Sequence, residues 1–151
     1  QVKKIYTGEV SNWKQLGGPD MEVVVISRDT SSGTYGVFSK KIMGEDKMGK
    51  NVSYVKSNSE ARDKVKTTKG AIGYIGFGYL GDETKAIALD GVKPTAKSIA
   101  QGDFPLARPL FMVTNGFPKV GSLAYKFVTF HLTETGQEVV SDQGFVPMTQ
   151  Y

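Results

Sequence analysis

The sequence predicts an α/β domain, and three patterns carry that prediction. Short apolar runs typical of buried strands, such as Val23-Val24-Val25-Ile26, alternate along the chain with segments of helical periodicity. Glycine, often beside proline or asparagine, separates these segments at turn positions. Of the 151 residues, 39% are hydrophobic and 23% are charged, a composition that fits one globular domain, alone or with an appendage.

The first half of the chain alternates helices with short strands. Gly8 and Gly44 stand where helices should end, and Ser57 precedes Glu60 by the three residues of a capping box. Trp13 should pack beneath the first helix end. In order, we predict a helix ending at Thr7-Gly8, an apolar turn at Trp13 and Leu16, a strand at 23–26, a helix at 34–43, an edge strand at 52–55 and a helix from Ser57 to about Thr68.

The second half continues the alternation and ends in helices. Small residues alternate with larger ones in the apolar run from Gly70 to Gly76, and glycine in a strand marks a bend or a close approach of another backbone. Prolines at 105 and 109 make a stiff extended link. We predict strands at 70–76, 86–89 and 110–113 and helices at 94–100, 122–132 and 134–141.

A polar loop, Ser27 to Thr34, directly follows the strand predicted at 23–26 and leads into the next helix. Amide hydrogens in a first helical turn lack intrahelical partners and lie at the positive end of the macrodipole. Hydroxyls, a glycine and one arginine beside them suit a small tetrahedral oxyanion. The expected ligand-binding residues are Arg28, Ser31, Ser32, Gly33 and Thr34. An ordinary N-cap would use the same serines without a ligand.

Charge and composition exclude several other functions. The net charge of +4 comes from scattered lysines with no dense basic run, so we expect no nucleic-acid partner. The chain has no cysteine, and its single histidine, His131, has no neighbours at metal-ligand spacing. Paired catalytic carboxylates and a nucleotide-binding glycine loop are also missing from the sequence. We therefore expect no metal, no cofactor and no catalytic residue.

Five motifs occur in order along the chain: residues 5–13, which end in Asn-Trp; the loop 27–34 with Arg and Ser-Gly-Thr; 70–74; 104–110; and 134–137 with 144–147. Together they resemble the second half of the solute-binding protein of Pst-type phosphate ABC transporters, a class II periplasmic-binding-protein fold. Each motif is weak alone, but their order and spacing together are specific. The resemblance implies binding of inorganic phosphate outside the cytoplasm, in the periplasm or on a cell-surface lipoprotein, for delivery to permease subunits.

The resemblance also implies a clamp of two domains that closes on one phosphate. Residues 1–116 would form the second domain, a mixed central sheet flanked by helices. Residues 117–151 would be a C-terminal helical segment that packs on a first domain absent from this chain. The chain starts without Met or a signal sequence, and we expect a processed or excised fragment.

Residue by residue, Arg28, Ser32, Gly33 and Thr34 match the family's phosphate contacts, and Ser31 falls between them. The family often has an acidic or small polar residue two positions after the arginine. This chain has Thr30 there and places Asp29 directly beside the arginine. The sequence leaves open which carboxylate, if any, holds Arg28.

Three alternatives remain open at the level of the sequence. The half-site could bind another tetrahedral oxyanion such as sulfate, because the carboxylate that would accept the proton of phosphate belongs, by the resemblance, to the absent domain. The chain could instead be a phosphoester-directed enzyme domain. It could also be an interaction module that dimerises or swaps domains through the helix face of Leu123, Phe127 and Phe130.

Overall fold

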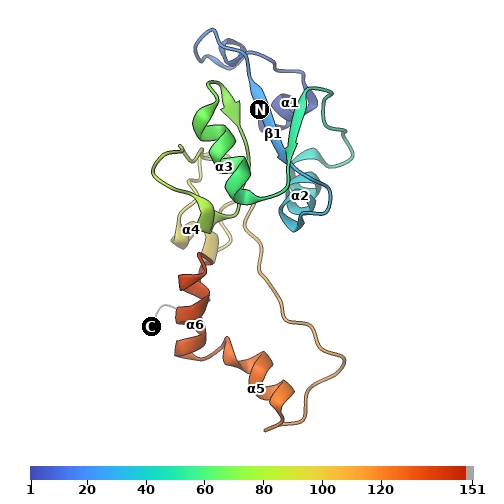
Figure 1. Cartoon of the computed structure of the whole chain (residues 1–151), viewed down its shortest axis with the longest axis vertical. Helices are drawn as coiled ribbons and strands as arrows, with labels where there is room; N and C mark the ends of the chain where they lie inside the picture. Colours follow the sequence, from blue (N-terminus) through green and yellow to red (C-terminus); the bar gives the residue numbers. More distant parts are fainter. Residues whose placement is uncertain (149–151) are drawn as a thin grey trace. The chain divides into compact units, whose positions relative to one another are not determined.

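The computed structural model describes residues 1–148, and the chain forms two compact units, Gln1–Ala86 and Ile87–Tyr151 (Figure 1). These two units differ from the predicted division into residues 1–116 and 117–151. The predicted division stays a prediction about the parent protein. Residues 149–151 of the predicted C-terminal segment lie outside the described residues.

The first unit is built on three parallel strands in the order β2-β1-β3 (Figure 1). The strands are β1 (Val24–Arg28), β2 (Val52–Val55) and β3 (Ala71–Ile72). In the register, Val25 of β1 pairs with Val52 on one side and Ile72 on the other. The α/β class is confirmed, and β2 is an edge strand as predicted. The strand pairs are parallel, where we predicted a mixed sheet.

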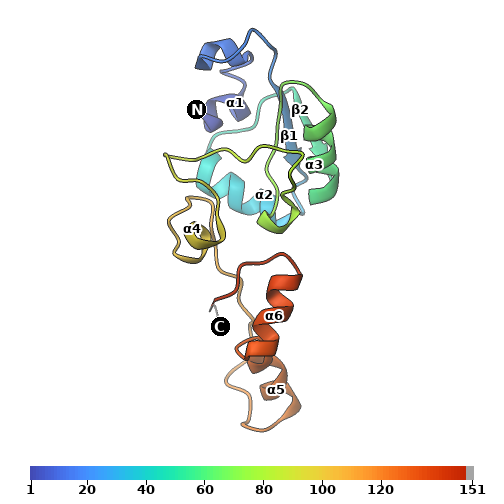
Figure 2. The same ribbon diagram turned by 90° about the vertical axis from the view of Figure 1, so that its left-hand side faces the viewer.

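Helices cover both faces of this sheet: α3 lies on one side of the strands, and α1 and α2 lie on the other (Figure 2). Ser57 caps α3 as predicted, because its Oγ accepts from the N–H of Glu60 at 3.0 Å. The core between α3 and the strands is formed by Ile26, Val55 and Ala61. The helical segments are α1 (Val2–Thr7), a 3-10 turn (Trp13–Leu16), α2 (Gly33–Phe38) with a π-helical turn (Ser39–Met43), α3 (Asn58–Thr67) and a 3-10 turn (Phe77–Tyr79).

The order of the strands creates a switch point beside β1. The chain leaves β1 through α2 and reaches β2, then passes through α3 to β3 on the opposite side of β1. Connections that leave in opposite directions open a crevice at the carboxyl ends of the strands, where ligands bind in open α/β sheets. Arg28 is the last residue of β1, so it lies at this point.

The glycine-rich run predicted as a strand over 70–76 pairs only at Ala71 and Ile72. Its glycines allow other residues to pack closely against this run, which does not extend the pairing with β1 beyond these two residues. A Cβ at Gly73 would lie 3.0 Å from Cγ2 of Val65 in α3, and the carbonyl of Gly70 accepts the indole N–H of Trp13 at 2.9 Å. Another backbone approaches this run closely at Gly70, as predicted, because a Cβ there would lie 2.3 Å from the carbonyl oxygen of Glu22. Trp13 is half-buried against it.

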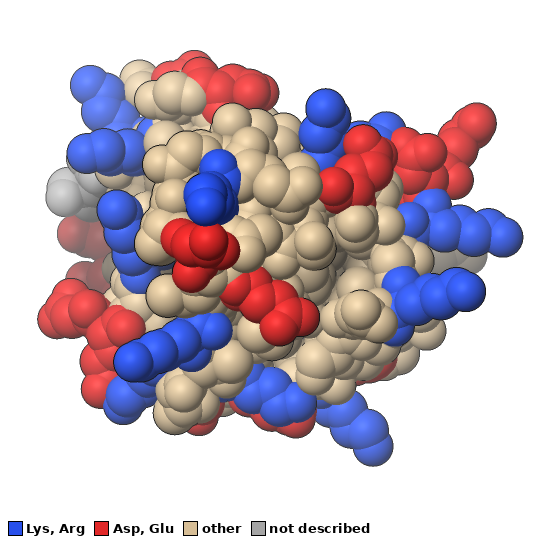
Figure 3. Space-filling model, turned by 90° about the horizontal axis from the view of Figure 1, so that it is seen from above, with Lys and Arg blue, Asp and Glu red and all other residues tan. Residues whose placement is uncertain are grey.

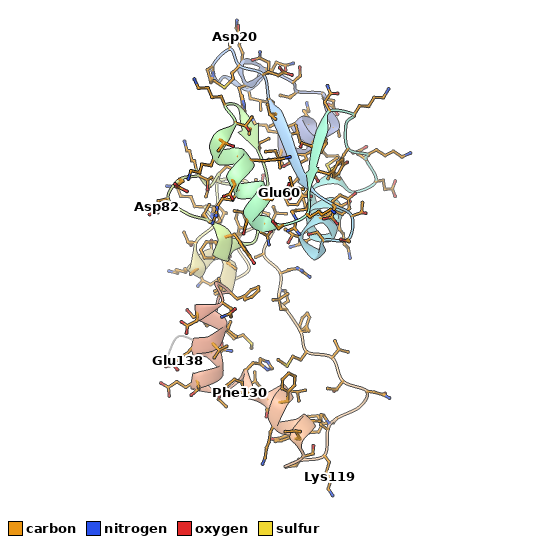
Figure 4. All side chains as sticks on the ribbon, in the orientation of Figure 1. Asp20, Glu60, Asp82, Lys119, Phe130 and Glu138 are labelled. Carbon is orange, nitrogen blue, oxygen red and sulfur yellow. The ribbon has the colours of Figure 1, made fainter. Side chains whose placement is uncertain are left out.

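In the described part of the second unit, residues 87–148, the helices are α4 (Ala96–Ala100), α5 (Leu123–Phe130) and α6 (Glu134–Asp142). Each begins at a side-chain cap, because the hydroxyls of Thr95, Ser122 and Thr133 accept backbone N–H groups of the first turn. Figure 4 labels Phe130 at the end of α5 and Glu138 within α6.

Two predicted strands are wrong. Residues 86–89 form only an isolated bridge between Leu89 and Val92, and residues 110–113 form no strand and are exposed, Val113 to 90%. A strand needs a neighbour that pairs with its backbone groups over several residues, and within residues 1–148 Leu89 is the only residue of the two runs that is paired in this way, with Val92. Residues 110–113 are therefore apolar, as buried strands are, but they are exposed in the structure.

The surface carries mixed charge. On the face in Figure 3, lysine and arginine side chains lie among aspartate and glutamate instead of forming a patch of one sign. Within residues 1–148 no helix has the length and apolar character needed to cross a membrane. The same part of the chain holds no group of three or more His, Asp or Glu side chains suited to a metal ion.

Candidate anion site at the carboxyl ends of the strands

Three loops meet around Arg28. They follow the carboxyl ends of β1, β2 and β3, and because the strands are parallel these ends share one edge of the sheet. The first loop carries the predicted residues Ser31 to Thr34, the second carries Lys56 and Asn58, and the third carries Tyr74 and Gly76. Hydrogen bonds join Arg28 to the second and third loops, and the first loop directly follows Arg28 in the chain.

The guanidinium of Arg28 is held by neutral oxygens. Its Nη1 donates to Oδ1 of Asn58 at 2.7 Å, and its Nη2 donates to the carbonyl of Lys56 at 2.9 Å. The residue is only 9% exposed, and its Nε has no hydrogen-bond partner within residues 1–148. No ion pair joins it to a carboxylate in the same part of the chain. A buried, charged donor left unpaired is costly, and such a group is commonly explained by a bound ion or ligand.

The main chain of Arg28 is fixed by a hydrogen-bonded relay. Its N–H donates to the hydroxyl of Tyr74 at 3.2 Å, that hydroxyl lies 2.7 Å from Oγ of Ser27, and Ser27 Oγ donates to the carbonyl of Arg28 at 3.0 Å. Burial raises the pKa of Tyr74 above its ordinary value, although the hydrogen bonds with Ser27 and Arg28 act in the opposite direction. The neutral phenol therefore persists at physiological pH, and it has the hydrogen that the relay needs.

Aromatic packing holds Tyr74 in place. Its ring stacks on Phe38 with centroids 4.0 Å apart, and both rings contact Tyr6, which donates its hydroxyl to the carbonyl of Ile26 at 3.0 Å. Phe38 is the last residue of α2 and Tyr6 lies in α1. The position of the Arg28 main chain is thus tied to the helices on one face of the sheet.

The serine loop is organised in part by its own contacts. Oγ of Ser32 accepts from the N–H groups of Thr34 at 3.2 Å and Tyr35 at 3.3 Å, which is an N-cap of α2. Ser31 donates both its N–H, at 2.9 Å, and its hydroxyl to Oδ1 of Asp29. These bonds from Ser31, the side-chain bond above all, lower the pKa of Asp29 below its ordinary value, and the nearby charge of Arg28 adds to the effect.

The five predicted binding residues are therefore placed near one another, but they are not equally available. Arg28 and the loop lie together at the switch point, and Gly33 is exposed. The hydroxyl of Ser32 keeps its hydrogen, because Ser32 Oγ acts as an acceptor in the cap. The hydroxyl hydrogen of Ser31 is directed to Asp29. Binding of a ligand by these residues stays a prediction.

Sequence reasoning missed the residues that hold Arg28. Asn58 and Lys56 flank Ser57, which the sequence marked only as a helix cap, and Tyr74 lies in the glycine-rich run that was assigned to a strand. A signal was available for Asn58, because it comes shortly after the strand predicted at 52–55 and ligands bind at the carboxyl ends of strands. Tyr74 carried no such signal, because it lies inside the run predicted as a strand.

Comparisons with known proteins give consistent results. A family model described as "PBP superfamily domain" matches residues 1–135. The chain is 36% identical over 151 residues to the phosphate-binding protein PstS of Bacillus subtilis, which covers 99% of this chain and 49% of that protein. It is 34% identical over 156 residues to the PstS protein of Borreliella burgdorferi, which covers 96% of this chain and 56% of that protein.

The fold is likewise similar to solved structures. One is a Clostridium perfringens protein described as the substrate-binding protein of a phosphate ABC transporter and solved with bound phosphate. It matches with a TM-score of 0.81 and 30% identity, over 99% of this chain and 61% of that chain. This chain spans about half the length of the curated relatives it matches.

Proposed function

The chain belongs to the PBP superfamily, and from that premise we propose that it contributes half of a binding site for inorganic phosphate in a protein that serves an ABC transporter. The observation that carries the proposal is the buried guanidinium of Arg28 at the switch point, with an unpaired Nε and no carboxylate partner within residues 1–148. A tetrahedral oxyanion would supply the missing acceptors.

The serine loop would complete this half of the site. This loop directly follows Arg28 in the chain, and it would offer the hydroxyl hydrogen of Ser32 and the exposed main chain of Gly33. Thr34 would add a second hydroxyl from the same loop. Ser31 would contribute least, because its hydroxyl is already engaged by Asp29.

The relatives are named as binding proteins and not as enzymes, and this favours binding of phosphate over catalysis on a phosphoester. By the resemblance, the full clamp would act outside the cytoplasm and present phosphate to permease subunits. The rest of the clamp, including a carboxylate that accepts the proton of phosphate, would come from a first domain of the same parent protein. The half-site alone should thus bind oxyanions weakly.

The half-site is tested by how well it distinguishes phosphate from sulfate. Sulfate has no proton to donate, so a site with a buried carboxylate acceptor rejects it, whereas donors alone accept both anions. We expect calorimetric titration of the chain with phosphate and with sulfate to give weak, saturable binding of both, with dissociation constants within about tenfold of each other. Tight, phosphate-selective binding would contradict the half-site, and no binding of either anion to the folded chain would contradict the proposal.

The proposed first domain would also cover apolar surface in the second unit. The face of α5 predicted for interaction is exposed, with Leu123 at 84%, Phe127 at 69% and Phe130 at 47%. Leu110 to Val113 add a further exposed apolar run. Exposed apolar area of this kind marks an interaction surface in soluble proteins. We propose that it packs on the remainder of the parent protein, and that in its absence two copies associate.

We expect the isolated chain to self-associate through this face. Replacing Leu123 and Phe127 by lysine should shift the chain toward monomer, because each change removes buried apolar area from the contact and adds a charge. Sedimentation velocity over a hundredfold range of concentration measures the effect. Val37→Lys, a half-buried apolar site in α2, serves as the matched control. A wild-type chain that stays monomeric throughout would count against this interpretation.

A further inference from the structure

The support of Arg28 differs from an ordinary buried ion pair. A buried guanidinium is usually compensated by a carboxylate. Here Asp29, the nearest acid in sequence, uses Oδ1 for the N–H and hydroxyl of Ser31 instead. The acceptors that reach the guanidinium are the amide oxygen of Asn58 and the carbonyl of Lys56, and neither carries a charge.

Asn58 occupies a fixed position between three elements. It is the first residue of α3, directly after the cap Ser57. Its Oδ1 accepts two hydrogen bonds, one from Nη1 of Arg28 at 2.7 Å and one from the N–H of Gly76 at 3.2 Å. The amide oxygen therefore ties the end of β1 to the start of α3 and to the loop after β3. The bond from Gly76 holds this oxygen in place, and the two bonds from the guanidinium, to Asn58 and to the carbonyl of Lys56, limit its rotation.

Building on the proposed function, we propose that Asn58 is the positioning residue of the anion site: its neutral oxygen orients Arg28 and leaves the charge of the guanidinium for the ligand. A carboxylate in the same place would accept the same two hydrogen bonds. It would also repel a bound anion on the other side of Arg28. The amide of Asn58 thus orients the guanidinium without neutralising its charge. After the bonds to Asn58 and Lys56, each Nη atom still has one hydrogen for a ligand, in addition to the hydrogen on Nε.

The substitution Asn58→Asp tests this directly, because it preserves the shape and the accepting Oδ1 while it replaces the NH2 group by an oxygen and adds a negative charge. We expect the dissociation constant for sulfate to rise at least about tenfold, because a unit charge a few ångströms from a doubly charged anion has an effect of that order even at the dielectric constant of bulk water, and a larger one in a partly buried site. The loss should be smaller for phosphate at mildly acidic pH, where that anion carries mostly one charge. A structural defect would weaken both anions equally, so the difference between them identifies the electrostatic role.

Asn51→Asp is the matched control. It makes the same change of charge in the exposed loop before β2, at the opposite edge of the sheet, and should alter sulfate binding less than twofold. Asn58→Ala removes the acceptor as well and should also weaken binding, while the amide signal of Gly76 shifts in the NMR spectrum because its partner is lost.

The outcomes separate this inference from the proposed function. Sulfate binding by Asn58→Asp that equals the wild type, or that falls equally with singly charged phosphate, overturns the role of Asn58 and leaves the anion site standing. If the wild-type chain is folded and binds neither sulfate nor phosphate, the proposed function fails and the inference fails with it.

Discussion

Arg28→Ala should abolish anion binding by the chain. The guanidinium is the only charged group in the site with a buried N–H donor, on Nε, that lacks a partner within residues 1–148, and each charge-assisted hydrogen bond contributes about 1.5–3 kcal/mol. Two such bonds correspond to about a hundredfold or more in affinity. Starting from weak binding, we expect calorimetry to show no saturable heat with phosphate or sulfate at accessible concentrations.

The fold should tolerate this change. Removing Arg28 also removes a buried charge whose Nε is unpaired, so the loss of its two neutral contacts is offset in part. Arg62→Ala provides the control, because Arg62 bonds its own neighbour Asp63 on α3 and its loss changes the net charge by the same amount. Arg28→Lys keeps the charge but loses the planar fork, and should bind with intermediate affinity. Unchanged binding by Arg28→Ala would remove the basis of the proposed site.

Gly70→Ala should destabilise the first unit strongly. Gly70 has a φ of +76°, and a Cβ there would lie 2.3 Å from the carbonyl oxygen of Glu22. Its own carbonyl accepts both the indole of Trp13 at 2.9 Å and the N–H of Val24 at 3.1 Å, so a shift of the backbone would break two bonds. The left-handed conformation alone costs about 1–2 kcal/mol for a residue with a Cβ. With the clash, we expect at least about 3 kcal/mol and a fall in Tm of more than about 10 °C.

Gly17→Ala separates the two causes. Gly17 has a similar φ of +82°, but a Cβ there meets nothing within 4 Å. This variant should lose only the conformational penalty, and its Tm should fall by less than half as much in the same thermal scan followed by circular dichroism. Equal effects of the two substitutions would show that the contact with Glu22 is unimportant.

Local signals in the sequence predicted the first unit well. The capping serine at 57, the terminating glycines at 8 and 44 and the apolar runs at 23–26 and 52–55 all lie where the structure uses them. These features act within a few residues, so a sequence read alone contains them. The loop from Ser27 to Thr34 was found for the same reason: strand, turn and helix follow one another directly.

Features that depend on distant partners were less accessible. The run 110–113 has strand composition, but a strand requires a neighbour, and none pairs with it in residues 1–148. Gly70 to Gly76 reads as one strand, yet Gly76 donates to Asn58 and leaves the ladder. Asn58 and Tyr74 lie 30 and 46 residues from Arg28, and only the strand order brings them to its side.

The most direct test of the anion site is to follow the backbone amides of Ser32, Gly33 and Thr34 by NMR while phosphate is added to the isotopically labelled chain. The account predicts saturable shifts that are confined to this loop and the Arg28 contacts, and that disappear in Arg28→Ala. A folded chain whose loop amides stay unchanged up to high phosphate concentration, while shifts appear elsewhere or nowhere, would contradict the account.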